Sequence, residues 1–264
     1  MPKLIRTLSL LALAIPACVV PSDARWGGVH ANGYAAGYYS NLGGSVSTRT
    51  QAGGGSTSGS FNVDRVGQGS HTLSSAAEVR AGFAPLELAL SGFDYSETAD
   101  GSFNGAFLGQ QFSGAVQSDF DVRAVKATGG LDVVNNGQFR VGALVGGHYL
   151  DADISLTDSG SGASARFDDQ VIVPVVGVRA DVAILPEILR AGGEITGMDV
   201  KVDEYDATFF DMMAAIYYTP VRPVEAVLGW RYTSMELDGD FTSKDSVTMD
   251  LEFSGPFLGV GLSF

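Results

Sequence analysis

Hydrophobic and polar residues alternate along most of this chain with a period of two. In residues 138–150 the odd positions are mostly apolar, from Phe139 to Tyr149, whereas the even positions include Arg140 and His148. The same alternation occupies residues 77–83, 172–184, 189–195, 210–218 and 224–237. A period of two puts alternate side chains on opposite faces of a β-strand. The pattern therefore predicts an all-β fold whose strands each have one apolar face.

The breaks between these segments differ in length. Tight breaks rich in Pro, Asn and Gly occur at residues 84–85, 135–137, 185–187 and 219–223. Longer polar stretches, at residues 99–115, 157–165 and 238–246, lie between them, together with a short join at 203–204. Membrane β-barrels have short turns at one end and longer loops at the other. Placing the four tight breaks at one end predicts nine strands from about residue 74 onward.

An even strand number requires one more strand upstream. Residues 33–42 are the candidate, and residues 45–72, dense in Gly, Ser and Thr, would then form a long outer loop. The apolar stripes end in aromatic residues, as the interfacial girdles of membrane barrels do: Phe83, Tyr149, Tyr218 and Tyr232. We therefore predict a transmembrane antiparallel up-and-down β-barrel of about ten strands, with eight as the alternative.

The first residues have the layout of a secretory signal. Lys3 and Arg6 precede an apolar run over residues 8–20 that is too short to cross a bilayer as a helix. A small-x-small cleavage site follows at residues 22–24. We expect a signal peptide over residues 1–24, removed on export.

The same segment contains a second candidate processing site. Residues 15–18 resemble a lipoprotein box and would place a lipid on Cys18, the single cysteine of the chain. Under the first alternative the barrel occupies residues 25–264 and contains no cysteine.

The chain ends in a strand pattern with a defined apolar face. Phe264 is preceded at every second position by an apolar residue. This pattern resembles the signal by which the barrel-assembly machinery recognises bacterial outer-membrane proteins, and that recognition requires an exposed strand edge. We assign the assembly signal to Leu258, Gly259, Val260, Leu262 and Phe264. Outer-membrane lipid and this machinery are the expected partners, with an ordinary strand ending in Phe as the alternative.

Residues 121–264 resemble a group of uncharacterised proteobacterial outer-membrane barrel proteins. The resemblance rests on the order of the strands, on Asp168 and Asp169 at the start of one hairpin, and on the closing segment 251–259. It implies a barrel and an outer-membrane location, and it implies no reaction or ligand. The Gly/Ser-rich N-terminal part departs from the group.

Composition and charge narrow the class further. The chain has 264 residues, with 30 Asp and Glu against 16 Lys and Arg, so its net charge is −14. This acidity excludes a nucleic-acid-binding protein, and an apolar content of 45% excludes an acidic disordered chain. The mean hydropathy is nevertheless +0.15. A barrel accounts for both values if the apolar residues face lipid and the acidic ones lie in loops and rims.

The alternation also assigns charged residues to the lumen. Six cations and seven anions fall on the polar face: Glu78, Arg80, Glu87, Lys126, Asp132, Arg140, Arg179, Asp181, Arg190, Glu194, Asp211, Glu225 and Arg231. Opposite charges in this near balance can pair and fill a narrow barrel, since unpaired buried charges are costly. A selective pore would show a one-sided ring of charge instead. We expect a lumen charge network that plugs the barrel.

The remaining acidic residues lie outside the predicted lumen face. Carboxylates at the outer rim can attract divalent cations or cationic ligands. No spacing matches a known calcium-binding loop, so solubilising loops are the simpler interpretation. We expect no cofactor and no dedicated metal site.

A catalytic site would require a base beside a nucleophile. The candidate bases are His30, His71 and His148, and only His148 points into the lumen near the outer end. We interpret His148 as a hydrogen-bonding lumen residue rather than a catalyst. The sequence thus predicts an outer-membrane barrel with a structural or surface-interaction role and no enzymatic activity. The alternatives are a narrow small-solute pore and, third, a rim-site lipid or peptide hydrolase.

Overall fold

The computed structural model describes residues 29–52, 55–202, 205–240 and 245–264. The expected signal peptide and the alternative lipidation at Cys18 lie outside these residues. The described elements are β1 (Val29–Ala52), β2 (Gly55–Asn62), the short 3-10 helix η1 (Val63–Val66), β3 (His71–Phe83), β4 (Leu86–Phe107), β5 (Gln110–Asn135), β6 (Phe139–Asp158), β7 (Ser164–Leu185), β8 (Leu189–Val202), β9 (Tyr205–Val221), β10 (Val224–Asp240) and β11 (Asp245–Ser263). Within the described chain, no helix is long and apolar enough to span a membrane.

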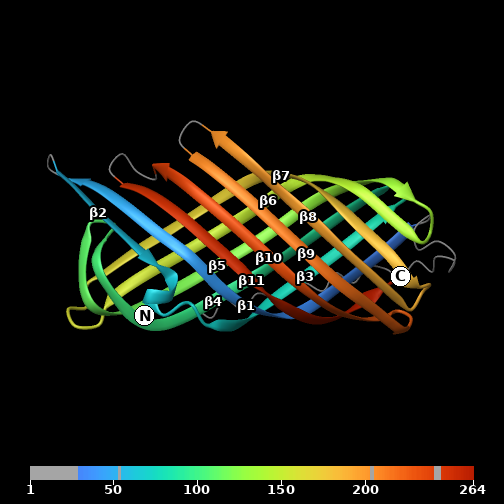
Figure 1. Cartoon of the computed structure of the whole chain (residues 1–264), viewed down its shortest axis with the longest axis horizontal. Coiled ribbons are helices and arrows are strands. Elements are labelled where there is room, and N and C mark those ends of the chain that lie inside the picture. The colour runs from blue at the N-terminus through green and yellow to red at the C-terminus, as the bar shows by residue number, and fades with distance from the viewer. Residues whose placement is uncertain (1–28, 53–54, 203–204, 241–244) are drawn as a thin grey trace.

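Ten of the strands close into a ring. From β3 to β11 each strand pairs with the next in antiparallel register, and β1 closes the ring by pairing with both β11 and β3. β2 is an eleventh strand. It pairs with the later part of β1, after the residues of β1 that pair with β3. Figure 1 shows the ring as a long, tilted barrel. The prediction of an up-and-down antiparallel barrel of about ten strands is confirmed.

The four tight turns and the C-terminus lie at one end of the barrel, which we call the inner end, and the opposite end is the outer end (Figure 1). The nine strands expected from about residue 74 onward correspond to β3–β11. The upstream strand is longer than the predicted residues 33–42, because β1 pairs with β11 without a register shift up to Thr50.

Two stretches expected to be outer loops are strands instead. Residues 45–52 and 55–72 contain the outer part of β1, β2, η1 and the start of β3. Most of residues 99–115 belong to the β4–β5 hairpin. Their Gly, Ser and Thr content suggested loops, yet cross-strand ladders satisfy their backbone groups: β1 with β2, and β4 with β5 up to Phe107 and Gln110. The prediction of loops there was wrong.

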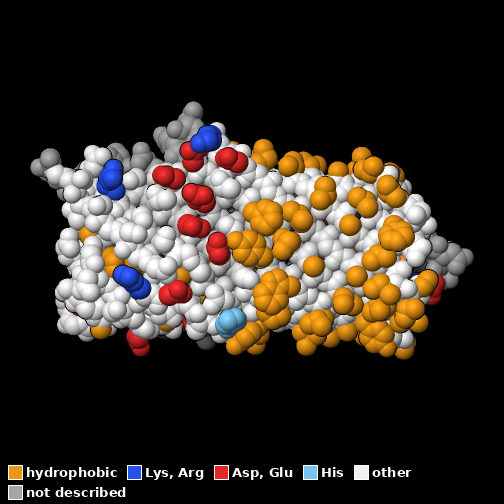
Figure 2. Space-filling model, viewed as in Figure 1, with side chains coloured by type: hydrophobic (Ala, Val, Ile, Leu, Met, Phe, Trp, Pro, Cys, Tyr) orange, Lys and Arg blue, Asp and Glu red, His pale blue; other side chains and the backbone are white. Residues whose placement is uncertain are grey.

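An apolar belt surrounds the inner half of the barrel. Its side chains point away from the lumen and are largely exposed, for example Leu88 at 72%, Val145 at 64% and Val260 at 68%. Figure 2 shows these side chains confined to the half that carries the C-terminus, while the outer half has a mostly polar surface. Such a belt matches the lipid-facing band of a membrane barrel.

The outer half has the reverse arrangement, because its apolar side chains point inward. On β6 the apolar positions are odd and outward from Phe139 to Val145, but even and inward from Leu150 to Leu156. β11 changes in the same way, with inward Val247–Phe253 and outward residues from Leu258 onward. The strands therefore continue beyond the belt as a barrel with an apolar interior. We call this interior the outer core; it includes Leu42, Val46, Phe61, Phe93, Tyr95, Phe103, Phe107, Phe112, Phe120, Ile154, Leu156, Leu251 and Phe253.

Candidate functional site

The lumen at the level of the belt holds all thirteen charged residues that the alternation assigned to it. Their side chains are at most 13% exposed, the highest value being that of Arg190. Each takes part in at least one ion pair with another member of the set. We call this set the charge network.

One part of the charge network surrounds Glu87 on β4. Its carboxylate contacts Arg179 of β7 and lies 2.8 Å from Nη2 of Arg140 on β6. The Nε2 atom of His30 lies 2.8 Å from the same carboxylate. Asp132 of β5 accepts hydrogen bonds from Arg140 Nε at 2.9 Å and from Arg179 Nη2 at 2.7 Å. Two carboxylates thus bridge two guanidinium groups near the inner end.

A second part crosses the lumen as a chain of alternating charge. Arg80 of β3 donates to Glu78 at 2.6 Å and to Glu194 of β8 at 2.8 Å. Lys126 of β5 donates to Glu194 at 2.6 Å and also contacts Asp211 of β9. This chain ties β3 to β8, β5 and β9, strands that come from distant parts of the sequence.

Asp211 is the outermost junction of this chain. Its carboxylate accepts hydrogen bonds from Arg231 Nε at 2.9 Å and from the Thr233 hydroxyl at 2.8 Å, both on β10, in addition to its contact with Lys126. Its side chain is fully buried. A carboxylate with three donors around it is held by charge-assisted hydrogen bonds, which are the stronger kind.

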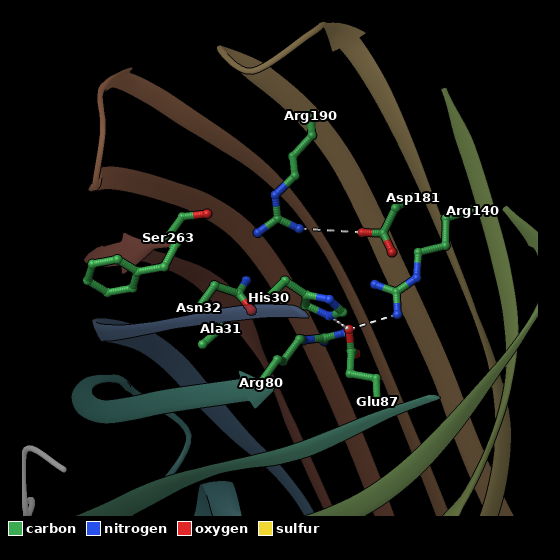
Figure 3. Close-up of a pocket in the computed structure, with 10 residues that line it drawn as sticks. His30, Ala31, Asn32, Arg80, Glu87, Arg140, Asp181, Arg190 and Ser263 are labelled. Carbon is green, nitrogen blue, oxygen red and sulfur yellow. Dashed lines mark hydrogen bonds and ion pairs between the residues drawn. The ribbon is translucent and has the colours of Figure 1, made fainter. Parts of the chain in front are cut away.

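The third part of the charge network surrounds Arg190, where the lumen opens at the inner end of the barrel. Arg190 donates to Glu225 at 3.2 Å, lies 3.6 Å from Asp181, and stacks 3.5 Å from the centre of the Tyr217 ring. Figure 3 shows Arg190 and Asp181 facing each other across a pocket that Phe264 also lines. This pocket measures about 40 Å³, room for about three water molecules at roughly 10–15 Å³ each.

Aromatic residues that we did not single out from the sequence complete this layer. Tyr34 stacks on Phe257 with centroids 6.0 Å apart, and the Arg231 guanidinium lies 5.1 Å from the Phe93 ring. Tyr38 donates from its hydroxyl to the Arg231 carbonyl at 3.3 Å. The alternation in the sequence already places these side chains on the inward face, but a pattern of charged residues alone does not reveal them.

The tip of the β4–β5 hairpin folds across the outer end of the lumen. The Leu108 N–H donates to the Thr48 hydroxyl on β1 at 3.2 Å. On β2, a Cβ atom added to Gly59 would lie 1.8 Å from the Ala106 carbonyl oxygen, so only glycine permits this approach. Phe61 lies 5.4 Å and 5.5 Å, centroid to centroid, from Phe103 and Phe107. The hairpin tip therefore caps the outer core.

The segment between β2 and β3 fills the wall where the β3–β4 ladder ends. That ladder stops at Asp94, and Val63 and Val66 of η1 are buried beyond it. Gln68 is also buried; its Nε2 donates to the Ser118 hydroxyl at 2.9 Å and to the Glu97 carbonyl at 3.2 Å. The side chain of Gln68 thus satisfies a backbone carbonyl of β4.

The three histidines do not assemble a catalytic group. His148 is buried below the outer core, stacked on Phe209 with centroids 4.0 Å apart, and its Nε2 has no hydrogen-bond partner among the described residues. His148 is thus a buried lumen residue, as expected, but its Nε2 does not make the expected hydrogen bond within the described chain. His30 lies at the inner mouth, and His71 stacks on Tyr39 on the outside.

Outward-pointing carboxylates lie just beyond the belt, and Figure 2 shows several of them as a band on one face of the barrel. This acidic collar consists of Asp94, Asp121, Asp151, Asp153, Asp168, Asp199, Asp206, Glu236, Asp238, Asp250 and Glu252. The cations paired with it are Arg123, Arg166 and Lys201. Glu236 lies directly opposite Asp250, and Asp238 opposite Asp206. Among the described residues no group of three or more His, Cys, Asp and Glu is arranged to hold a metal ion.

The assembly-signal residues form the last part of β11. Leu258, Val260, Leu262 and Phe264 point outward into the belt, each at least 44% exposed. Gly259 packs against β1, where an added Cβ would lie 2.6 Å from the Ala35 carbonyl oxygen. The apolar face expected of the signal is thus lipid-facing, while its recognition by the assembly machinery stays a prediction.

No protein-family model matches the chain, and no curated protein matches it. Neisserial surface protein A aligns over 90% of this chain and 98% of its own, with 12% identity and a TM-score of 0.33. Ail, the attachment invasion locus protein of Yersinia pestis, aligns over 89% and 99%, with 12% identity and a TM-score of 0.29. The transport unit of the autotransporter AIDA-I from Escherichia coli aligns over 94% of both chains, with 10% identity and a TM-score of 0.38. Similarities of this size carry no argument about function.

Proposed function

We propose that this protein is an integral outer-membrane barrel, closed to solutes, that holds a rigid β-extension outside the membrane for surface interaction. The main support for the proposal is that side chains fill the interior of the barrel at two levels along its axis. The charge network occupies the lumen within the belt, and the outer core occupies it beyond the belt. A barrel used for conduction would need a continuous open path through both levels.

The balance of the charge network supports a plug over a selective filter. Six cations and seven anions pair across the lumen, and buried aromatic, aliphatic and hydroxyl side chains lie among them. Ten strands enclose little space beyond their own side chains, because barrel diameter grows with strand number. The rim-site hydrolase is the least favoured alternative, since His148 packs against Phe209 away from any open rim.

Purified protein reconstituted into planar lipid bilayers is expected to show no stable single-channel conductance steps. The physical reason is that ions would have to displace buried charge pairs and then cross an apolar core. A large porin added to the same bilayers is the positive control. Reproducible conductance steps from the folded protein would replace this proposal with the alternative of a narrow pore.

We also propose that the acidic collar attracts divalent cations, which bridge it to lipid phosphates. Like charges directly opposite on neighbouring strands cost about 0.2–1 kcal/mol per pair, and Glu236 and Asp250 form such a pair. Mobile cations above the belt would relieve that repulsion. The collar thus provides a surface-interaction role for which no buried metal site is needed.

Magnesium is expected to raise the temperature at which the folded protein loses its fast gel mobility in anionic-lipid vesicles. A variant with Glu236→Gln, Asp250→Asn and Glu252→Gln should lose most of that increase. Sodium chloride at equal ionic strength controls for simple screening. An equal magnesium effect on the variant and the unmodified chain would contradict a role for these carboxylates.

A further inference from the structure

Two of the described strands, β2 and the outer part of β7, have a long unpaired edge at the outer end of the barrel. β2 pairs with β1 from Gly55 to Asn62, and no described strand pairs with its other edge. Figure 1 shows β2 at the outer end beside β1, far from the belt. An unpaired edge presents backbone N–H and C=O groups that can pair with another chain.

The register identifies which backbone groups are free. Ala31 exchanges hydrogen bonds with Phe264 of β11, so the odd positions of β1 are directed to β11 and the even positions to β3 and β2. Even β1 positions oppose odd β2 positions, as Thr48 opposes Gly59. The N–H and C=O groups of the even β2 residues Ser56, Ser58 and Ser60 therefore point to the free edge.

This edge lacks the devices that normally prevent strand pairing. β2 contains no charged residue, no proline and no bulge, and those are the features that protect exposed edges. Two other long ladder gaps among the described strands are protected. The gap along β4 beyond Asp94 is covered by Gln68 and by the folded hairpin tip. The gap along β7 from Ser164 to Val175 carries charged residues and a proline, which are Arg166, Asp168, Asp169 and Pro174. Among the described strands, β2 is therefore the long unpaired edge that carries no charged residue and no proline.

Two arginines and one carboxylate, Asp64 of η1, are exposed near the edge, so the local charge is positive by one. Arg49 lies on β1 directly opposite Ser58 and is exposed, and Arg65 is exposed at the end of η1. Neither arginine forms an ion pair with a described residue, although the whole chain has a net charge of −14. An acidic partner segment fits this location by charge.

A second copy in the same membrane does not fit. Barrel strands tilt by about 35–45° from the membrane normal, so two copies related by an axis along that normal would cross their β2 strands at about 70–90°. Neighbouring strands in a ladder differ by only about 20–25°. The occupant must therefore be free to orient itself independently of the barrel.

We propose that β2 is a docking edge for an extended, acidic peptide segment of a partner protein, which adds as a strand beside Ser56–Ser60. Main-chain hydrogen bonds supply the affinity in this mode of recognition, and Arg49 selects for acidic side chains. This inference rests on the proposed surface-interaction role and names the partner class for it.

The test uses the full mature chain in lipid nanodiscs and a fluorescent, end-blocked octapeptide in which Thr and Glu alternate. Ser58→Pro removes the edge N–H and leaves the β1 ladder intact, a position at which proline is tolerated. We expect Ser58→Pro to weaken binding at least tenfold and Ser58→Thr, the matched control, to change it less than twofold. Arg49→Glu should weaken binding several-fold, and an octapeptide of alternating Thr and Lys should bind more weakly.

Hydrogen exchange gives an independent readout of the same edge. The amides of Ser56, Ser58 and Ser60 should exchange rapidly in the free protein and slow on binding the Thr/Glu octapeptide. Absence of binding, equal binding by Ser58→Pro, or slow exchange in the free protein would each overturn the docking edge. None of these results tests conductance. The proposal of a closed lumen is therefore tested separately, by the bilayer recordings.

Discussion

Replacing Asp211 with alanine is expected to destabilise the barrel more than any other single change in the lumen. The carboxylate is fully buried and accepts hydrogen bonds from Lys126, Arg231 and Thr233. Its removal leaves the Arg231 guanidinium buried with no other ion-pair partner among the described residues. Breaking a buried pair in this way costs about 3–5 kcal/mol. The temperature of the gel-mobility shift should therefore fall by roughly 10 °C.

Two matched variants separate the charge from its surroundings. Asp199→Ala removes an exposed carboxylate on β8 and should shift the midpoint by less than about 2 °C, since isolated surface charges contribute little. Thr233→Val removes one neutral donor to Asp211 and should cost about 1 kcal/mol. Equal midpoints for Asp211→Ala and Asp199→Ala would show that the charge network does not hold the barrel together. Asp211→Ala should still conduct no ions, because the outer core lies above it.

Much of the fold follows from the alternation alone. In β10, for example, Leu228 and Trp230 fall on one face and Glu225 and Arg231 on the other, and a strand in a barrel wall has only two faces to offer. The same odd–even alternation predicted that all thirteen charged residues of the charge network point into the lumen. The side of the strand on which each residue lies could be predicted, because it depends only on the spacing of residues along that strand.

The partners inside the lumen could not be predicted in this way. The alternation predicts that Lys126 and Asp211 both point inward. Whether they meet depends on the stagger of β5 against β9 across the barrel, at a sequence separation of 85. The capping role of the β4–β5 hairpin was also missed, since it depends on the bend that brings Ala106 onto Gly59. Contacts across a closed sheet are set by register and curvature, which a single strand does not encode.

The length of the strands was underestimated for a different reason. The apolar face from which each strand was predicted ends before the strand does, as at Tyr149 on β6. The strand continues there with its apolar residues on the other face, from Leu150 to Leu156. This change of phase marks the level where the environment outside the barrel changes from lipid to water. It is visible in the sequence, and it separates a projecting barrel from one that ends in loops.

Replacing Gly59 with valine is expected to detach the β4–β5 hairpin tip from the β1–β2 hairpin. The new Cβ atom would lie 1.8 Å from the Ala106 carbonyl oxygen and 2.9 Å from its nitrogen. Both are backbone atoms, so the hairpin tip itself must move. The movement would separate Phe61 from Phe103 and Phe107, and each such aromatic pair contributes about 0.5–1.5 kcal/mol beyond its buried area. Chymotrypsin should then cut the folded protein after Phe107 at least ten times faster.

Ser58→Val is the matched control, because Ser58 lies next to Gly59 but points outward and is exposed. It adds the same side chain to the same strand and should leave the cleavage rate unchanged. The gel mobility of both variants should remain that of the folded barrel, since the belt and the charge network lie below the hairpin tip. Equal cleavage of Gly59→Val and Ser58→Val would mean that the close approach of β2 to Ala106 does not hold the cap. Faster cleavage of Gly59→Val alone would show that a single glycine keeps the outer core closed, independently of the charge network beneath it.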